Sequence, residues 1–416
     1  MNVAGIIAEY NPFHNGHRYQ LDTLREKTGA DYVVIAMSGN FVQRGVPAFF
    51  DKFERAKAAL CCGADLVLEI PTVWATASAE YFASAGVSLL GSTGVVQHLG
   101  YGVESHTPDL MKEIISLLQD SPQVFHELIM KHQKQGNSYP VSRFFALCQL
   151  LPHFSESEVK AFLSSPNNIL ALEYEKALAK WNKNSINPIT SHPILRLGAG
   201  YHEDTLTDGF SSATAIRKAW MEQTSIENVA AYIPLECQKI YRPLLEERHF
   251  VSEDEISSLL YYKLLSNATI GYESYADCSA SLSHKIQKNL TKYKNFSQFC
   301  SLLKSKDLTY TRICRVLTHI LLDIRQIDYK NAYNGCKIPY IRILGFREQS
   351  EDLLKSIKKM ANAPLIAKMA DAPNILTPET YQVLEKDIFS GDLYYHLHHF
   401  SAPMNEISHP IIKINV

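Results

Sequence analysis

The sequence has no long hydrophobic run. Its longest apolar stretches, such as residues 33–37 and 87–90, are far shorter than the roughly 20 residues that a membrane-spanning helix needs. The apolar stretch 3–8 has no basic flank and runs directly into Glu9, so it does not resemble a secretory signal. The eight cysteines include no CxxC pair, a pattern that favours neither a zinc site nor a disulfide framework. We therefore expect a cytoplasmic protein with reduced thiols and no membrane partner.

An excess of one charge sign is also lacking over the whole chain, because 41 Lys and Arg nearly balance 43 Asp and Glu. The charges are unevenly distributed: residues 280–370 contain 17 Lys and Arg but 6 Asp and Glu, a local charge of +11. Such a segment is typical of proteins that bind nucleic acid, since Lys and Arg displace counterions from phosphates. The alternative is an ordinary solvated helical surface. Disorder is excluded, because 46% of the residues are hydrophobic and 20% are charged.

Strand-like and helix-like segments alternate over the first 120 residues. Such alternation indicates parallel βαβ units, so we predict an α/β fold with a Rossmann-like open parallel sheet. Ligands of these sheets bind beyond the carboxyl ends of the strands. The predicted strands are residues 3–8, 31–37 and 65–70, and the predicted helices are residues 17–27, 50–59 and 77–90.

Helices are expected to dominate the rest of the chain. Residues 108–185 have a helical pattern with a break at 164–168, and residues 192–197 are expected to return to the sheet. No linker rich in Pro, Gly or Ser marks a boundary, but long amphipathic helical patterns begin after about residue 235. We therefore predict an α/β catalytic domain, residues 1–230, and a mainly helical, basic domain, residues 231–416. The expected amphipathic helices of the second domain include residues 253–266, 283–293 and 310–327.

Two histidines follow the first predicted strand, in the sequence His14-Asn15-Gly16-His17. This motif falls where a strand gives way to the start of a helix. Free backbone N–H groups and the helix dipole favour an anion there, imidazole N–H groups add directed donors, and a glycine lets a ligand approach the backbone. We interpret the motif as a site for nucleotide phosphates that stabilises charge during attack at phosphorus. A zinc site lacks a third ligand at suitable spacing, and loop histidines with no catalytic role remain an alternative.

A second motif places hydroxyl groups before a helix. Ser211, Ser212 and Thr214 lie at the predicted helix start, and Arg217 follows one turn later. Serine at an N-cap is ordinary helix chemistry, so a capped surface helix is one interpretation. Hydroxyl groups, free N–H groups and a guanidinium at one helix terminus also form a phosphate clamp. The two motifs together are more specific than either alone.

The pair of motifs resembles the nucleotidyltransferase superfamily, which also includes class I aminoacyl-tRNA synthetases. Further segments resemble one family in particular, the bacterial tRNA(Met) cytidine acetate ligases. That resemblance implies a nucleotidyltransferase-type sheet and extends along the whole chain. The segments that carry it are residues 5–17, 37–45, 63–71, 166–170, 201–204, 317–321 and 339–345.

The resemblance implies a two-step reaction with ATP as co-substrate. Acetate attacks the α-phosphate of ATP to form acetyl-adenylate, and the wobble cytidine of elongator tRNA(Met) then receives the acetyl group on N4. The implied partners are therefore acetate and elongator tRNA(Met), and no obligate protein partner is indicated. Mg²⁺ is expected with ATP on charge grounds, although no dedicated carboxylate cluster is visible. Glu9 could hold Mg²⁺, act as a base or orient an imidazole.

The resemblance also implies roles for individual residues. His14, His17, Ser212 and Arg217 are implied to be catalytic. Gly102 matches a family glycine near the nucleotide, although Val103 stands where a serine is expected. Asn167 could alternatively be a helix N-cap. The residues implied to contact ATP are Ile7, Ala8, Glu9, Tyr10, Asn11, Pro12, Phe13, His14, Asn15, Gly16, His17, Arg18, Tyr19, Gln20, Gly102, Asn167, Arg196, Ser211 and Thr214.

Other cationic residues are weaker candidates. Arg44 and Lys52 could reach phosphate or tRNA, or could be solvated surface charges. Several members of three basic groups are expected to contact the tRNA backbone: Lys285, Lys288, Lys292 and Lys294; Lys355, Lys358 and Lys359; Arg342 and Arg347, which flank an expected glycine turn. We interpret the cluster His396, His398 and His399 as part of a packing segment rather than a metal site.

Two other functions remain open from the sequence. One is a small-molecule adenylyltransferase of the same superfamily, which would not need the long basic segment. The other is a non-enzymatic RNA-binding factor with an inactive nucleotide site. The presence of both motifs in one chain argues against this alternative.

Overall fold

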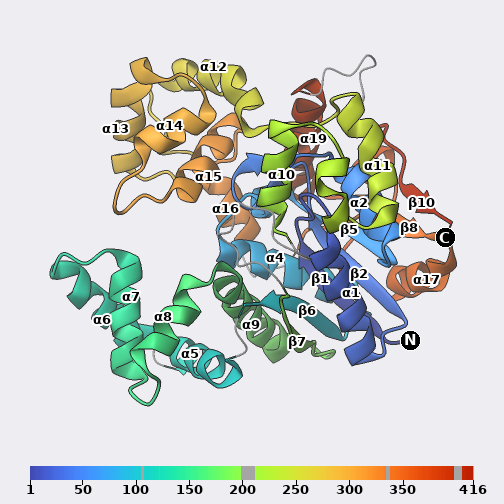
Figure 1. The fold of residues 1–416 in the computed structure, drawn as a ribbon, viewed down its shortest axis with the longest axis horizontal. Coiled ribbons are helices and arrows are strands. Elements are labelled where there is room, and N and C mark those ends of the chain that lie inside the picture. Colours follow the sequence, from blue (N-terminus) through green and yellow to red (C-terminus); the bar gives the residue numbers. More distant parts are fainter. Residues whose placement is uncertain (105–106, 121, 198–210, 334–337, 398–404, 416) are drawn as a thin grey trace.

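The computed structural model describes residues 1–104, 107–120, 122–197, 211–333, 338–397 and 405–415 (Figure 1). A twisted sheet forms the centre, and helices cover both of its faces. Two further helical units project from it on the left of Figure 1: α5–α8 below and α12–α15 above. None of the helices described has the length and apolarity to cross a membrane.

The main sheet has the strand order β10-β8-β5-β2-β1-β6-β7, with β9 paired to β8. All its pairs are parallel except β5 with β8. β3 and β4 form a separate antiparallel pair. The strands are β1 (Val3–Ala8), β2 (Tyr32–Ser38), β3 (Phe41–Val42), β4 (Val46–Pro47), β5 (Leu66–Ile70), β6 (His98–Val103), β7 (Thr190–Leu195), β8 (Ile341–Arg347), β9 (Leu365–Ile366) and β10 (Ile412–Ile414).

The central strands are buried on both faces, which explains their almost continuous apolar sequences. Helices connect them and cover the sheet. The helices are α1 (Asn15–Thr28), α2 (Lys52–Cys61), α3 (Thr72–Ala75), α4 (Ala79–Ser92), α5 (Pro108–Asp120), α6 (Pro122–Lys134), α7 (Tyr139–Leu150), α8 (Glu156–Ser164), α9 (Pro166–Asn184), α10 (Ala213–Glu222), α11 (Leu235–Glu246), α12 (Ser257–Asn267), α13 (Ala280–Asn289), α14 (Phe296–Leu303), α15 (Tyr310–Leu321), α16 (Gln326–Tyr333), α17 (Glu351–Met360), α18 (Ala372–Ile375) and α19 (Pro378–Leu397).

The predicted α/β fold with an open, mostly parallel sheet is confirmed. The three N-terminal strands and the strand expected near residues 192–197 all lie in the sheet, the last as β7. β6 was not predicted. Its two glycines weaken a strand pattern, yet Gly100 allows close packing, because a Cβ there would lie 2.6 Å from Leu24 of α1.

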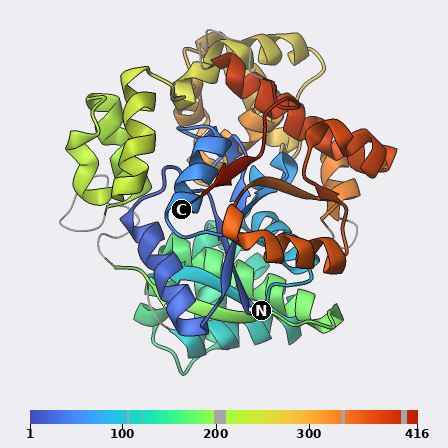
Figure 2. The same ribbon diagram turned by 90° about the vertical axis from the view of Figure 1, so that its right-hand side faces the viewer.

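The C-terminal part of the chain completes the sheet. β8 pairs with β5, and β10 extends the edge beyond β8. In Figure 2 the C-terminal strands and α17 therefore lie beside the N-terminal strands. The predicted boundary after residue 230 does not coincide with a limit of the sheet. The mainly helical, basic domain over residues 231–416 stays a prediction.

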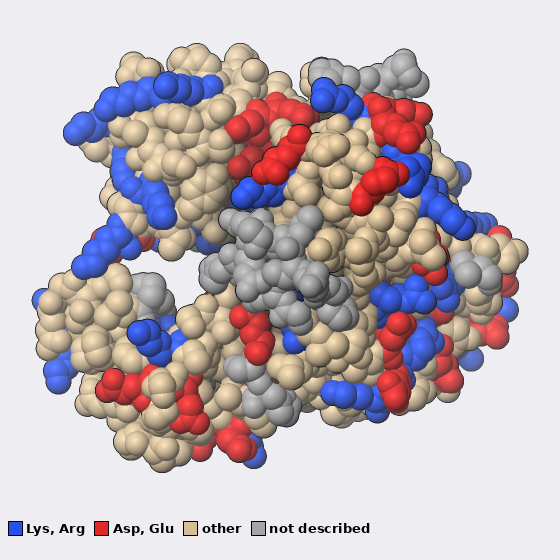
Figure 3. All heavy atoms as spheres, in the orientation of Figure 1, with Lys and Arg blue, Asp and Glu red and all other residues tan. Residues whose placement is uncertain are grey.

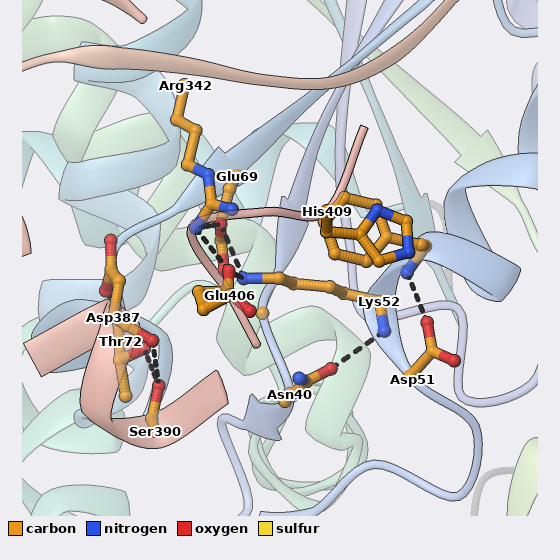
Figure 4. A network of polar contacts seen from close by, with 12 residues as sticks. Asn40, Asp51, Lys52, Glu69, Thr72, Arg342, Asp387, Ser390, Glu406 and His409 are labelled. Carbon is orange, nitrogen blue, oxygen red and sulfur yellow. Dashed lines mark hydrogen bonds and ion pairs between the residues drawn. The ribbon is translucent and has the colours of Figure 1, made fainter. Parts of the chain in front are cut away.

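A buried ionic network links the N-terminal part of the sheet to β8 and to the segment that contains Glu406 (Figure 4). Lys52, at the start of α2, lies 2.7 Å from a carboxylate oxygen of Glu69 and also contacts Glu406. Arg342 of β8 lies 2.7 Å from Glu69 and 2.6 Å from Glu406. All four side chains are at most 2% exposed. Two cations and two carboxylates thus compensate each other away from water.

The two projecting helical units also touch. Lys306, after α14, donates a hydrogen bond of 2.9 Å from Nζ to the carbonyl oxygen of Gly136, after α6. Figure 3 shows that an opening remains between the units and that Lys and Arg side chains lie on both sides of it. This side of the molecule thus offers a concave, partly basic surface.

Candidate active site

A pocket lies at the carboxyl ends of β1, β6 and β7, which are neighbours in the sheet. The N-termini of α1 and α10 open onto the same pocket, so both motifs found in the sequence meet there. The hollow measures about 1140 Å³ including the space open to solvent. Its place in the fold is where open parallel sheets bind ligands.

His14 and His17 are held by the first turn of α1. His14 is the N-cap, and its Nδ1 accepts a hydrogen bond of 3.0 Å from the backbone N–H of Gly16. Nδ1 of His17 accepts from the backbone N–H of His14 at 3.3 Å. Because both Nδ1 atoms accept, a neutral ring must carry its proton on Nε2. Each histidine therefore has an Nε2–H donor to offer a ligand.

Both histidines are neutral at pH 7. Burial, together with Arg196 and Arg217, lowers the pKa of His14 to about 3. Burial, His14 and Arg196 lower the pKa of His17 well below its usual value. The two rings stack with centroids 3.8 Å apart, an arrangement that two imidazolium ions would disfavour. Tyr10 packs edge-on against His17 with centroids 4.8 Å apart and fixes its ring.

The second motif also caps a helix. Ser212 is the N-cap of α10, and its Oγ accepts from the N–H of Ala215 at 3.1 Å. Arg217, one turn along, donates to the backbone carbonyl of Asn11 and, at 3.4 Å, to Thr214 Oγ1. Arg44 reaches the same hydroxyl at 3.5 Å. The helix start is therefore a capped terminus as well as a cluster of N–H groups and guanidinium groups facing the pocket.

The opposite wall is formed by β6, β7 and α9. Arg196 directly follows β7, and a Cβ on Gly102 would lie 3.2 Å from its Cγ. Glycine at position 102 therefore makes room for the arginine. The alternative interpretation of Asn167 as a helix N-cap is wrong, because α9 begins at Pro166 and its N-cap is Ser165. Its side-chain amide donates to Glu104 at 2.5 Å.

Most of the residues implied to contact ATP line this pocket. They are Ile7, Ala8, Glu9, Tyr10, Asn11, His14, His17, Gln20, Gly102, Asn167, Arg196 and Thr214, together with Ser212 and Arg217. Gly16, Tyr19 and Ser211 line a smaller adjoining pocket.

Four residues of the implied ATP segment line neither pocket. Phe13 is fully buried, and its N–H donates to Tyr241. Asn15 donates to the carbonyl of Ala231, while Arg18 forms ion pairs with Asp22 and Glu236. The fourth is Pro12, between Asn11 and Phe13. Phe13, Asn15 and Arg18 are therefore held by contacts within the protein and are not part of either pocket lining.

Several lining residues were not predicted. Leu170 and Tyr174 follow Asn167 at helical spacing on α9, so a helix beginning at Pro166 would have placed all three on one face. Tyr101 lies on the unpredicted strand β6. Gln43 lines the pocket too, and its backbone N–H donates to Glu9 at 2.9 Å. The remaining unpredicted residues are Val42, Val46, Phe82 and Ala213.

Two proposals for Lys52 were wrong. It is 1% exposed and lies in the ionic network, so it is neither a solvated charge nor a contact for phosphate or tRNA. Arg342 is likewise buried in that network, and Gly345 lies within β8 rather than in a turn. Arg347 donates from Nε to the carbonyl of Leu60 at 2.8 Å. These contacts join segments far apart in the sequence, which local patterns cannot reveal.

The remaining basic residues lie on α13, on the segment between α13 and α14, and on α17. Lys288, Lys292 and Lys294 are exposed, whereas Lys285 donates to the carbonyl of Leu303 at the end of α14. Lys355, Lys358 and Lys359 are exposed on α17. Tyr394, Tyr395 and Leu397 are buried, as a packing segment requires. His398, His399 and the segment 201–204 lie outside the described residues.

Comparisons with known proteins agree with this geometry. Residues 1–407 match the model of a family described as HIGH Nucleotidyl Transferase. A tRNA(Met) cytidine acetate ligase of Thermoanaerobacter sp. (strain X514) is 37% identical over 416 residues, and the alignment covers 100% of both chains. The chain belongs to the HIGH nucleotidyl transferases and to the tRNA(Met) cytidine acetate ligase family. A ligase of this family from Clostridium perfringens (strain SM101 / Type A) is 37% identical over 421 residues, with 100% of this chain and 97% of that relative covered.

Solved structures of the ligase family share the fold. The apo form of Thermotoga maritima TmcAL matches with a TM-score of 0.90, and the form bound with alpha-thio ATP matches with 0.89. Both are 30% identical to this chain, and each comparison covers 100% of both chains. The resemblance inferred from the motifs is confirmed over the full length.

Proposed function

We propose that this protein is an ATP-dependent ligase that activates acetate as acetyl-adenylate and acetylates N4 of the wobble cytidine of elongator tRNA(Met). The single observation that carries this proposal is the convergence of two neutral histidine Nε2–H donors, three arginines and two helix N-termini in one pocket. Full-length relatives bear this ligase name, and one structural neighbour was solved with an ATP analogue.

In the first step, an acetate oxygen attacks the α-phosphorus of ATP and pyrophosphate leaves. Nε2–H of His14 and of His17 would donate to phosphate oxygens as negative charge shifts onto them. Arg196, Arg217 and the N-terminus of α10 would bind the phosphate chain from the other walls. Neutral histidines suit this task, because they donate without giving up the proton.

Mg²⁺ would accompany ATP, bound chiefly by the phosphates. Among the residues described, no group of three or more His, Cys, Asp or Glu could hold a metal ion. Glu9 lines the pocket and could reach such an ion, although its carboxylate also accepts from the N–H of Gln43.

In the second step, the cytidine amine attacks the acetyl carbonyl and AMP leaves. We propose that exposed lysines of α13 and the segment after it contact the tRNA backbone, beside the concave surface between the helical units (Figure 3).

The first step can be tested alone. The purified protein should exchange labelled pyrophosphate into ATP when acetate is present and not when it is omitted. Exchange that does not respond to acetate would contradict acetate activation. It would favour the small-molecule adenylyltransferase, the alternative that the full-length relatives do not support.

A further inference from the structure

A second hollow adjoins the proposed ATP pocket. It lies between the start of α10 and the start of α15, measures about 1090 Å³ including the space open to solvent, and shares Arg44, Val46, Thr214 and Arg217 with the ATP pocket. Its walls are partly apolar, with Pro47 and Met221 among the lining residues. The two hollows therefore adjoin along a wall formed by four residues, with Thr214 and Arg217 of α10 among them.

The charge of Arg217 acts on titratable groups in both hollows. Its charge lowers the pKa of His14 on one side and counters the raised pKa of Glu253 on the other. It also donates to the carbonyl of Asn11, in the lining of the ATP pocket. Glu253 therefore lines the hollow whose wall, through Arg44, Thr214 and Arg217, is shared with the first pocket.

Of the two carboxylates that line this hollow, Glu253 makes fewer hydrogen bonds within the protein than Asp254. Its neighbour Asp254 accepts hydrogen bonds of 2.8 Å from both the N–H and the Oγ of Ser297, so Asp254 holds the start of α14. Glu253 has one weak partner among the described residues, the hydroxyl of Tyr310 at 3.5 Å. Burial is the main reason that its pKa is raised, and Asp254 adds to that effect. A carboxylate whose pKa lies above its usual value accepts a proton more readily than an ordinary surface glutamate.

We propose that this hollow receives a pyrimidine base with an exocyclic amine, extruded from an RNA strand, and that Glu253 is the catalytic base for that amine. The inference rests on the proposed function and supplies its missing acceptor site. A carboxylate that accepts from the amine of cytosine selects it over uracil, which presents a carbonyl oxygen at the same position. Tyr310 and the apolar wall offer surfaces for the ring.

The step balances without any further reactant. The amine nitrogen forms a bond to the acetyl carbon, and one N–H proton passes to the Glu253 carboxylate. The bond from that carbon to the adenylate oxygen breaks, and AMP leaves with the electron pair. Arg217, between the hollows, would stabilise the phosphate of the leaving AMP.

Glu253→Gln tests this proposal because it keeps the shape and removes the proton acceptor. Acetate-dependent pyrophosphate exchange should stay within about twofold of wild type, while single-turnover acetyl transfer to elongator tRNA(Met) should fall at least about 100-fold. Glu253→Asp should recover part of the transfer rate. Glu247→Gln, at an exposed carboxylate after α11, is the matched control and should alter neither rate.

The pH profile distinguishes a base from a merely structural residue. The wild-type transfer rate should fall at acidic pH as Glu253 becomes protonated, and the residual rate of Glu253→Gln should lack this limb. The groups that influence the charge of Glu253 are Asp254, Arg44, Arg217 and Tyr310, and Lys218 and Cys314 also line the hollow. Normal transfer by Glu253→Gln, or an unchanged acidic limb, would overturn the assignment. A wild-type protein without acetate-dependent exchange would instead contradict the proposed function itself.

Discussion

Replacement of His14 by asparagine separates its role as a helix cap from its proposed role as a phosphate donor. Nδ1 of His14 caps α1 through the N–H of Gly16, and Nε2–H is the proposed donor to phosphate. Asparagine is a good N-cap, so His14→Asn should keep the cap and lose only the donor. His14→Ala loses both and should be less stable than His14→Asn by about 1 kcal/mol.

The two variants should be alike in catalysis. Loss of one preorganised donor to transition-state charge costs about 10²–10³ in rate. Acetate-dependent pyrophosphate exchange should therefore fall by about that factor in both variants, and urea unfolding should report their different stabilities. If His14→Asn exchanged at a rate within about threefold of wild type, His14 would be a helix cap and not a catalytic residue.

Three further predictions concern pH, the buried network and the basic surface. The folded-state pKa of His14, about 3, lies below its unfolded value, so the unfolded chain binds more protons at pH 5 and stability is lost as the pH falls below about 6.5. Between pH 7 and pH 5, the free energy of unfolding of the wild type, measured with urea, should therefore fall by about 2 kcal/mol more than that of His14→Asn. Equal decreases would contradict a buried neutral imidazole. Lys52→Met leaves two buried carboxylates facing Arg342 and should lower the free energy of unfolding by about 3–5 kcal/mol. The control Lys57→Met, on the exposed side of α2, should change it by less than about 0.5 kcal/mol. A decrease below about 1 kcal/mol for Lys52→Met would show that the network is dispensable. Replacing Lys288, Lys292 and Lys294 together by alanine should weaken tRNA binding, reduce its salt slope by up to about 1 per contact, and leave pyrophosphate exchange intact. The same change at Lys355, Lys358 and Lys359 on α17, on the far side of the sheet, tests the second predicted tRNA-binding group separately (Figure 1). An unchanged affinity and salt slope in the first triple variant would make that group a solvated surface.

Local patterns were sufficient where the chemistry is local. The continuous apolar runs of β1, β2 and β5 predicted buried parallel strands, and the two helix-start motifs marked residues that the fold brings into one pocket. The hydroxyl groups before α10 were predicted as a cap or a phosphate clamp, and the structure shows that Ser212 is the cap.

Long-range pairing was beyond the reach of these patterns. β8 and β10 join the sheet only because β5 offers an edge, and nothing near residue 341 signals that partner. Lys52 and Arg342 resembled surface cations because their counter-charges, Glu69 and Glu406, are distant in the sequence. Glu253 drew no attention for the same reason: its neighbours Arg217 and Tyr310 come from other helices.

The most direct test of the account is incubation of the protein with ATP, labelled acetate and an elongator tRNA(Met) transcript, followed by nucleoside analysis. We expect the label in N4-acetylcytidine, and none when ATP is omitted. Absence of label from the tRNA, with a folded protein that binds ATP, would contradict the proposed function.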